Sequence, residues 1–328
     1  EKIFFHWMKN IQDWNISRQI VWGIPIPAKI CKKCDGGFAD IEDKITKCPK
    51  CGGEVYNDPD TFDTWFSSGQ WPFAALGYPD DNDYKIYYPT DVMETGADIL
   101  FFWVARMIML GIYVTGEIPF KTVYLHGMVR DVNRQKMSKS KGNVISPIEM
   151  SEKYGTDALR MALVVGNTPG SDMALSEDKI KGYKHFANKI WNASRFVLDN
   201  IKDIDSNIKP EITAEEKKLL DELAIEVKEI TDDIENYRFY LAAEKIYHYF
   251  WHNFADVIIE ESKSRLSSRD EFIRKSAQWT LFEILSVMIK VIHPFMPFIT
   301  EEIWSMLPIK DKKMLMIENW PIREKESE

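Results

Sequence analysis

The sequence predicts a chain of two parts: an α/β part over residues 1–175, followed by an all-α helical bundle over residues 176–328. The four cysteines and the short β-branched runs lie before residue 175. Glycine almost disappears after it, with Gly182 as the only example. Apolar residues there recur at steps of three and four, which is the pattern of amphipathic helices.

In the α/β part, the run KTVYLHGMV over residues 121–129 predicts a buried strand. An apolar helix is expected before it, over residues 98–112, with a Thr-Gly pair at its start. After a loop rich in Lys and Ser, residues 147–154 and 157–165 predict two more helices, and a proline begins the first of them.

In the bundle, three apolar stripes predict helices that cover residues 220–241, 247–258 and 277–292. The third stripe stops at Pro294, because proline cannot continue a helix. The polar segment over residues 202–210 is expected to link two helices.

The composition is that of a globular protein with a large core. Of the 328 residues, 45% are hydrophobic and 28% are charged, and the net charge is −9. Intrinsic disorder is excluded, because 11 Trp, 13 Tyr and 18 Phe are too many aromatic groups to leave in water. Four Cys are too few for a secreted disulfide scaffold. The acidic balance argues against a protein that coats nucleic acid generally.

The most apolar stretch, residues 99–114, contains Arg106 and is too short to cross a bilayer comfortably. We therefore expect a buried helix and no membrane contact. The chain opens with EKIFFHWMKN, which has neither an initiator Met nor the layout of a signal peptide. We expect a piece of a longer polypeptide that is located in the cytoplasm.

A possible metal knuckle lies within residues 29–55, where Cys31, Cys34, Cys48 and Cys51 follow the pattern C-x2-C, thirteen residues, C-x2-C. Four soft thiolates suit a closed tetrahedral Zn²⁺ site, with each sulfur about 2.3 Å from the metal. Because protein ligands fill all four positions, we expect a structural zinc site without an activated water. An iron–sulfur cluster, two disulfides or four unused thiols are the alternatives.

Residues 130–143 read RDVNRQKMSKSKGN, in which lysines alternate with serines. Such a loop can bring ammonium and hydroxyl groups to a polyphosphate with little steric bulk. Neutralising charge on phosphates is the main catalytic demand of phosphoryl and nucleotidyl transfer. On charge alone, a solvated basic loop is the alternative.

Four segments contain specific sequence motifs: WNISRQIVWGIPIP (14–27), DTWFSSGQWPF (63–73), ETGADILFFWVARMIMLG (94–111), and HGMVRD with KMSKSKGNVISP (126–147). Three more extend the same pattern: YGTDALR (154–160), FANKIWNASRF (186–196) and HPFMPFITEEIW (293–304). In these segments the chain resembles the class I aminoacyl-tRNA synthetases, and specifically the valyl-tRNA synthetases. The resemblance implies half of a Rossmann-type catalytic domain with an inserted zinc knuckle, and a helical anticodon-binding domain behind it.

The resemblance also implies a reaction. A synthetase makes an aminoacyl adenylate from an amino acid and ATP, with Mg²⁺, and transfers the acyl group to the terminal ribose of tRNA. For the valyl enzymes the partners are L-valine, ATP and tRNA(Val), and we expect a monomer. Lys136 and Lys139 are the implied catalytic residues, on the ATP phosphates. The other implied ATP-binding residues are His126, Gly127, Val129, Met137, Ser138 and Ser140.

A valine side chain needs an apolar slot with rigid walls, and Trp65, Ile99 and Trp103 can supply them. The last two lie at i and i+4 on one face of the predicted helix, and all three match the family's side-chain pocket. Core packing explains any one of them equally well. Three residues at the start of that helix are expected to contact polar atoms of the adenylate: Thr95, Gly96 and Asp98.

The chain also departs from the family. The family's other ATP signature, His-Ile-Gly-His, is absent, since none of the six histidines stands in that context. In the family, this signature and the editing domain come before the segments matched here. We therefore expect this chain to hold half of an active site and to be inactive alone.

Three alternatives remain open. Isoleucyl-tRNA synthetases share KMSKS, although ADILFFWVAR at residues 97–106 differs from their usual Asp-Gln-Thr-Arg-Gly-Trp. A non-catalytic tRNA-binding module would have no need of both KMSKS lysines. A zinc hydrolase needs an open coordination position, which four thiolates do not leave.

RNA contacts are expected in the bundle, where aromatic or Arg side chains can hold unstacked anticodon bases. Core packing is again the alternative for each candidate. The candidates are Arg238, Tyr240 and Trp251.

Overall fold

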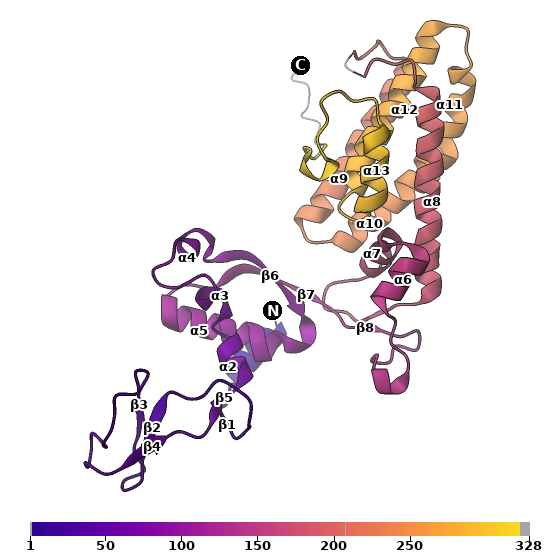
Figure 1. Cartoon of the computed structure of the whole chain (residues 1–328). Coiled ribbons are helices and arrows are strands. Elements are labelled where there is room, and N and C mark those ends of the chain that lie inside the picture. Colours follow the sequence, from indigo (N-terminus) through magenta and orange to yellow (C-terminus); the bar gives the residue numbers. More distant parts are fainter. Residues whose placement is uncertain (1, 207, 322–328) are drawn as a thin grey trace. The chain divides into compact units, whose positions relative to one another are not determined.

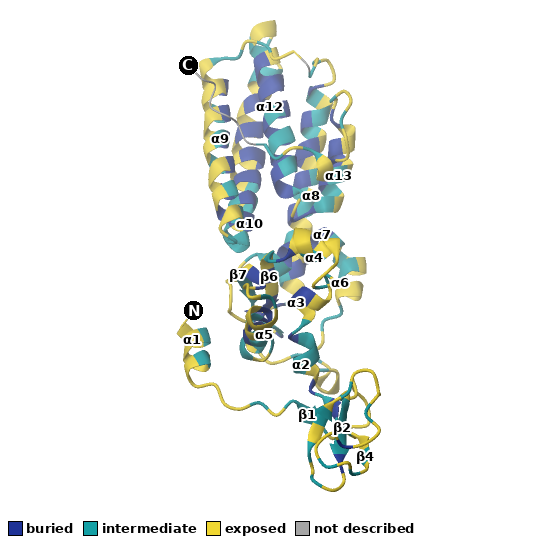
Figure 2. Cartoon of the chain, turned by 90° about the vertical axis from the view of Figure 1, so that its left-hand side faces the viewer, coloured by how far each residue is buried: buried dark blue, intermediate teal, exposed yellow. Residues whose placement is uncertain are grey.

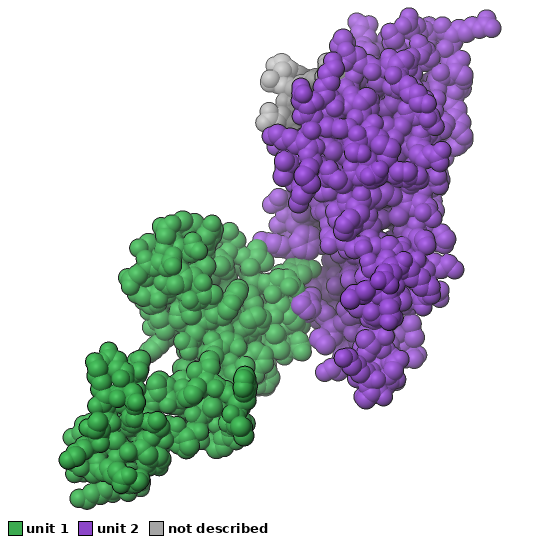
Figure 3. All heavy atoms as spheres, in the orientation of Figure 1, with its two compact units in different colours: residues 1–125 green, residues 126–328 purple. Residues whose placement is uncertain are grey.

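The computed structural model describes residues 2–206 and 208–321, and the chain forms two compact units (Figure 3). Unit 1 is Glu1–Leu125 and unit 2 is His126–Glu328. This division follows packing, whereas the predicted domain boundary near residue 175 follows composition and stays a prediction.

Unit 1 opens with α1 (Lys2–Lys9) and two small antiparallel sheets (Figure 1). β2 (Ala28–Cys31) is the central strand of one sheet and pairs with β3 (Gly37–Ala39) and β4 (Val55–Asn57). In the other sheet, the elements are β1 (Ser17–Arg18) and β5 (Thr61–Phe62).

The rest of unit 1 is built on a strand–helix–strand arrangement, in which β6 (Thr90–Gly96) pairs with β7 (Phe120–His126). The helical stretch between them confirms the helix predicted over residues 98–112. It runs through η1 (Ala97–Ile99), η2 (Leu100–Ala105) and α5 (Arg106–Thr115), and η2 is a π-helix. Three short helices precede β6: α2 (Thr64–Ser68), α3 (Trp71–Ala74) and α4 (Asn82–Tyr87).

This helical stretch is longer and less buried than the sequence analysis expects. Ala97–Thr115 has 19 residues, and an 18-residue window of it has a mean hydropathy of 1.8. Within the described residues it is the one helix with the length and composition of a membrane span. Only 22% of its apolar window is buried. One face, which bears Val104 and Met107, packs on a small core, whereas Phe102 and Ile112 are exposed. A single helix of this kind is weak evidence for a membrane span.

The predicted strand over residues 121–129 is interrupted in the structure. β7 ends at His126, and β8 (Val129–Arg130) pairs in parallel with a different strand, β9 (Met173–Ala174). Gly127 lies at the break, where a Cβ atom would be 1.8 Å from the carbonyl oxygen of Ser171. The chain changes partner at a point where only a glycine fits.

The lysine-rich loop follows β8 and contains one 3-10 turn, η3 (Lys139–Lys141). α6 (Pro147–Tyr154) and α7 (Thr156–Val164) then confirm the two helices predicted after the loop. Buried residues of α7, of β9 with the residue after it, and of the next helix form a small core: Ala158, Leu159, Ala162, Met173, Leu175 and Ile180.

The remainder of unit 2 is a helical bundle, which confirms the predicted all-α part. Figure 2 shows that α12 (Glu271–Ile292) is largely buried, whereas α9 (Ala214–Glu235) has one buried and one exposed side. The other elements are α8 (Glu177–Asn200), α10 (Phe239–His248), the π-helix η4 (Tyr249–Ile258), α11 (Ile259–Leu266), α13 (Pro297–Met306) and η5 (Leu315–Ile317).

One predicted helix of the bundle is in fact two. The stripe over residues 220–241 is broken after α9, where Tyr237 has a φ of 58°. Asp233 holds this corner, because its carboxylate accepts a hydrogen bond from Arg238 Nε at 2.7 Å and pairs with Lys245 Nζ at 3.1 Å. Both helices bury their apolar sides in one core, so the apolar period continues across the break.

A buried carboxylate fastens α7 to α13. Asp157 is 7% exposed, and it accepts hydrogen bonds from the backbone N–H groups of Phe298 at 3.2 Å and Ile299 at 2.7 Å. Burial raises the pKa of Asp157, against the opposite effect of these two bonds. Arg160, one turn later, donates to the carbonyl oxygen of Pro294 at 2.9 Å. The first turn of α13 is therefore capped from another helix.

Candidate functional site

The four cysteines of the knuckle converge beside the three-stranded sheet of unit 1. Their Sγ atoms all lie within 4.8 Å of one another, with 3.6 Å between Cys31 and Cys51 and 3.7 Å between Cys34 and Cys48. A tetrahedral ion with metal–sulfur bonds of about 2.3 Å holds its sulfurs about 3.8 Å apart. The donor set therefore fits a thiophilic cation. The thiols are free, which excludes the alternative of two disulfides in this structure.

The backbone around the knuckle leaves room for the sulfurs. A Cβ atom on Gly53 would lie 3.2 Å from Cys31 Sγ and 3.3 Å from Cys51 Sγ, so a larger residue would crowd both. The backbone N–H of Lys33 donates to Cys31 Sγ at 3.3 Å. This hydrogen bond is the main cause that lowers the pKa of Cys31 to about 6, which favours the thiolate that a metal requires.

Cys31→Ser is expected to remove most of the metal from the purified chain, because a serine hydroxyl is a poor ligand for a thiophilic ion. Metal content is measured by elemental analysis before and after dialysis against a chelator. Lys44→Ser, a change at an exposed position of the same knuckle, is the control and should leave the metal in place. A wild-type chain that contains no metal and is indifferent to the chelator contradicts a metal centre.

Two polar side chains hold the ends of the lysine-rich loop together. Asp131 is 9% exposed and accepts hydrogen bonds from the backbone N–H groups of Asn133 at 3.0 Å and Gln135 at 2.8 Å, and from the Asn143 side chain at 2.7 Å. Asn143 Oδ1 in turn accepts from the backbone N–H of Ser138 at 2.9 Å. The bond from Asn143, followed by those from the backbone, lowers the pKa of Asp131, so its carboxylate is charged at neutral pH.

Within this frame the loop presents its lysines to solvent. Lys136 and Lys139 are exposed, whereas Met137 is half-buried and packs against the small core beneath the loop. Ser138 Oγ and Ser140 Oγ lie 3.2 Å apart. The implied ATP-binding residues thus form one continuous segment from the end of β7 to η3, with its hydrophobic anchor inward and its ammonium groups outward.

Asp131 and Asn143 are not predicted from the sequence as the residues that hold the loop. Asp and Asn are common turn residues, and both stand at the ends of the quoted loop. Their twelve-residue separation carries no periodic signal that could predict the hydrogen bond between them.

Asn143→Ala is expected to loosen the loop, because it removes the side chain that joins Asp131 to Ser138. Brief trypsin treatment should then cleave after the loop lysines about tenfold faster, which corresponds to the loss of about one net hydrogen bond. Asn133→Ala is the matched control, since Asn133 enters this network through its backbone N–H. Equal cleavage rates for wild type and Asn143→Ala, measured by mass spectrometry, contradict this role.

The residues predicted to line an amino-acid pocket lie in unit 1 around α2. Trp65 is in α2, and the Nε1–H of Trp103 donates to the carbonyl oxygen of Ser68, the last residue of the same helix, at 3.1 Å. The Trp65 ring lies 6.2 Å from that of Phe102. One short helix therefore contacts both predicted tryptophan walls. Both rings are half-buried, as is Ile99.

Thr95 and Gly96 are buried and end β6, and Gly96 is also the N-cap of η1, so these residues lie where the strand gives way to the helical stretch. Asp98 is exposed in the first turn of η1. One detail of the backbone differs from the prediction. Ile99 ends a 3-10 turn and Trp103 lies in the π-helix η2, so the predicted i and i+4 spacing does not fall in a regular α-helix. π-Helical turns are frequent at functional sites.

The three predicted RNA-contacting residues are spread along one helical run. Arg238 precedes α10 and is held by Asp233, and Tyr240 is half-buried in the first turn of α10. Trp251 lies in η4, with its ring stacked 6.1 Å from that of Phe186. About three and a half helical turns separate Arg238 from Trp251, so one small ligand cannot contact both.

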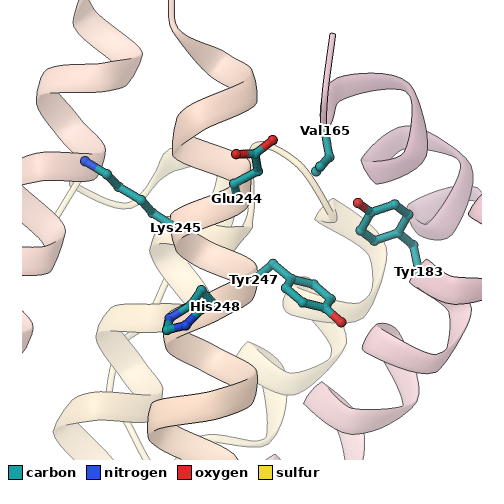
Figure 4. A pocket seen from close by; sticks show the side chains of 6 residues that line it. All are labelled: Val165, Tyr183, Glu244, Lys245, Tyr247 and His248. Carbon is teal, nitrogen blue, oxygen red and sulfur yellow. The ribbon is translucent and has the colours of Figure 1, made fainter. Parts of the chain in front are cut away.

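A pocket of the bundle is lined in part by Tyr183 and Tyr247 (Figure 4). The rings of Tyr183 and Tyr247 meet there edge to face at 6.0 Å, and the Tyr247 ring is 5.5 Å from that of Trp251. Burial raises the pKa of Tyr183 to about 12, so its hydroxyl group stays protonated. This pocket is not predicted from the sequence, because its lining comes from three helices or their ends: Val165, Tyr183, Glu244, Lys245, Tyr247 and His248.

Comparisons with known proteins find a matching family for each of the two parts of the chain. Residues 1–176 match the family described as "tRNA synthetases class I (I, L, M and V)", and residues 216–328 match "Anticodon-binding domain of tRNA ligase". Similar curated proteins include the valine–tRNA ligases of Clostridium acetobutylicum (45% identity, 99% of this chain, 37% of the relative), Thermotoga maritima (44%, 99%, 37%) and Syntrophotalea carbinolica (46%, 94%, 35%). The chain thus spans little more than a third of the length of these relatives.

Solved structures agree on the fold. The chain is similar to a LeuRS of Agrobacterium radiobacter K84 in a ternary complex with tRNA and LeuAMS, with a TM-score of 0.76, 23% identity and coverage of 98% of this chain and 44% of that one. It is also similar to the Mycobacterium tuberculosis methionyl-tRNA synthetase in complex with methionyl-adenylate, with a TM-score of 0.72, 21% identity and coverage of 92% and 56%. These likenesses concern the fold: part of a catalytic domain, followed by a helical domain.

Proposed function

Because this chain belongs to the class I tRNA synthetase family, we propose that it is the portion of a valine–tRNA ligase that carries the KMSKS loop, the valine pocket and the anticodon-binding domain. The observation that carries the proposal is the 44–46% identity to valine–tRNA ligases along 94–99% of the chain. The whole enzyme acts in the cytoplasm as a monomer.

The proposed reaction has two steps. A carboxylate oxygen of L-valine attacks the α-phosphorus of ATP, the bond to the β-phosphate breaks, and pyrophosphate leaves with valyl-adenylate remaining. A hydroxyl group of the terminal ribose of tRNA(Val) then attacks the valyl carbonyl carbon, and AMP leaves. No residue of the chain needs to form a covalent intermediate.

In this proposal the ammonium groups of Lys136 and Lys139 neutralise the phosphate charge that grows as pyrophosphate departs, together with Mg²⁺. Their exposure and the anchored backbone between them support the role. His126, Gly127 and Val129 line the nucleotide where β7 gives way to β8. Met137 serves as the anchor of the loop, and two hydroxyl groups bind phosphate oxygens: Ser138 and Ser140.

In the valine pocket, Trp65, Ile99 and Trp103 form the apolar walls. The exposed carboxylate of Asp98 binds the ammonium group of the amino acid, and backbone groups of Thr95 and Gly96 at the end of β6 bind polar atoms of the adenylate. The half-buried state of the three apolar residues supports a wall that a ligand can still reach.

The metal of the four-cysteine cluster is proposed to be Zn²⁺ in a structural role. Four thiolates and the observed sulfur spacing support zinc, and they leave no coordination position for a reacting water. The tRNA is proposed to contact the bundle through Arg238, Tyr240 and Trp251, with aromatic stacking at Trp251.

Amino-acid-dependent ATP–pyrophosphate exchange tests the function. The assay compares this chain with a polypeptide that is extended upstream through the His-Ile-Gly-His signature. Valine-dependent exchange by the extended polypeptide is the expected result. Exchange with isoleucine would make the chain an isoleucyl enzyme, and exchange with neither amino acid would favour a non-catalytic tRNA-binding module.

A further inference from the structure

Asp63 joins two segments of unit 1 through a single carboxylate. Its Oδ1 accepts the backbone N–H of Trp65 at 2.9 Å and so caps the first turn of α2. Its Oδ2 accepts the Nε1–H of Trp14 at 2.9 Å and the Nη2–H of Arg18 at 2.6 Å. The backbone N–H of Asp63 also donates to the carbonyl oxygen of Ile16 at 2.7 Å. These contacts fix the start of α2 to the segment that contains Trp14 and Arg18.

The surroundings keep this carboxylate charged and in place. Only 8% of the Asp63 side chain is exposed. Burial acts to raise its pKa, but the hydrogen bonds from Trp65 and Trp14 and the charge of Arg18 outweigh burial, so the pKa is lowered overall. The Arg106 guanidinium group lies 3.6 Å from the centre of the Trp14 ring, which packs that ring against the helical stretch after β6.

The far end of α2 is held as closely as the near end. The carbonyl oxygen of Ser68 accepts the indole N–H of Trp103. At the next residue, a Cβ atom on Gly69 would lie 2.8 Å from Leu110 Cδ1, so the end of α2 packs closely against the Leu110 side chain of α5. A helix of five residues thus carries the Trp65 ring at one end and holds the Trp103 ring at the other.

We propose that Asp63 is a positioning residue that sets the separation of the Trp65 and Trp103 walls and thereby the selection of valine against isoleucine. The inference rests on the proposed function, in which these two rings bound the valine side chain. Valine and isoleucine differ by one methylene group, which an apolar pocket distinguishes by about 10–200-fold. Discrimination of this kind depends on a fixed wall, and the Asp63 carboxylate is the contact that fixes the α2 end of the wall.

The test is pyrophosphate exchange by the full-length enzyme with valine and with isoleucine, for wild type, Asp63→Ala, Asp63→Ser and Trp14→Phe. Asp63→Ala should raise the KM for valine about tenfold with kcat within about twofold, and should lower the valine-to-isoleucine ratio of kcat/KM about tenfold. Asp63→Ser should fall between wild type and Asp63→Ala, because serine still caps Trp65 but cannot hold Trp14 and Arg18. Trp14→Phe keeps an aromatic ring next to Arg106 but removes the N–H donor together with the five-membered ring, so it should shift the KM and the valine-to-isoleucine ratio in the same directions as Asp63→Ala.

Asp81→Ala is the matched control. Asp81 caps α4 in the same unit by accepting the backbone N–H of Asp83 at 3.1 Å, and its loss should change neither the KM nor the ratio. If Asp63 serves stability alone, its variants lose active enzyme, so that kcat falls while the KM and the ratio stay at wild-type values; that pattern overturns the inference. Should Asp63→Ala fail to fold, the KM and the valine-to-isoleucine ratio of Asp63→Ser and Trp14→Phe test the inference in its place. Wild-type enzyme without valine-dependent exchange overturns the proposed function and this inference with it.

Discussion

Lys139→Ala is expected to slow valine-dependent pyrophosphate exchange by the full-length enzyme about 10²–10³-fold. The lysine begins the 3-10 turn of the loop, and its side chain is exposed. Its ammonium group can therefore follow the charge that develops on the departing pyrophosphate, where fixed electrostatic stabilisation has its largest effect on rate. Because an exposed side chain contributes little to packing, the unfolding midpoint in urea should stay at the wild-type value.

Lys141→Ala is the matched control for this result. It removes the same charge from the same turn, but family resemblance places only Lys136 and Lys139 on the phosphates. We expect a much smaller loss of exchange. Equal losses for the two variants would indicate that the loop acts through its net charge, and wild-type exchange by Lys139→Ala would remove that residue from the catalytic machinery.

Gly127→Ala is expected to destabilise the start of unit 2 by about 3 kcal/mol. The added Cβ atom would meet Ser171 O at 1.8 Å, Ser171 C at 2.1 Å and Asp172 N at 2.6 Å. All three are backbone atoms, so no side chain can rotate away, and the pairing of β8 with β9 must open instead. Because the lysine-rich loop leaves directly from β8, we expect exchange activity to fall with stability.

Urea unfolding followed by circular dichroism measures this effect, with Gly182→Ala as the control. Gly182 lies within α8, and a Cβ atom there would meet nothing within 4 Å. That substitution should stabilise the chain by about 0.5–1 kcal/mol, because alanine has less conformational entropy to lose in a helix. Equal midpoints for wild type and Gly127→Ala would show that the close approach at Gly127 relaxes at little cost.

Local patterns predict much of this protein. The spacing of Cys31, Cys34, Cys48 and Cys51 predicts a metal knuckle, and their sulfurs converge at distances that fit one. The helices at residues 147–154 and 277–292 follow from a proline start and from an apolar period, both of which act within a few residues. In each case the physical cause lies inside the segment that shows the pattern.

Features that depend on distant partners escape prediction. At the break after α9, Asp233 contacts Arg238, just before α10, and Lys245, within α10, while the apolar period continues across the break. The end of β7 lies next to Gly127, whose backbone closely approaches the backbone of Ser171, 44 residues later in the chain. Asp63 lies 49 residues from Trp14 and 45 from Arg18, and the residues themselves do not reveal this pairing. Sequence separation, not residue chemistry, hides these positions.

The cap that Asp157 places on α13 has a consequence for the order in which the protein is made. The backbone N–H of Phe298 comes 141 residues after Asp157 in the chain. At a synthesis rate of about 5–20 residues per second, roughly 7–28 s pass on the ribosome before the two can meet. During this interval α7 lacks its contact with α13. Apolar residues that α13 later covers are exposed and can bind chaperones. The synthesis of α13 therefore completes the support beneath a loop that was synthesised long before it.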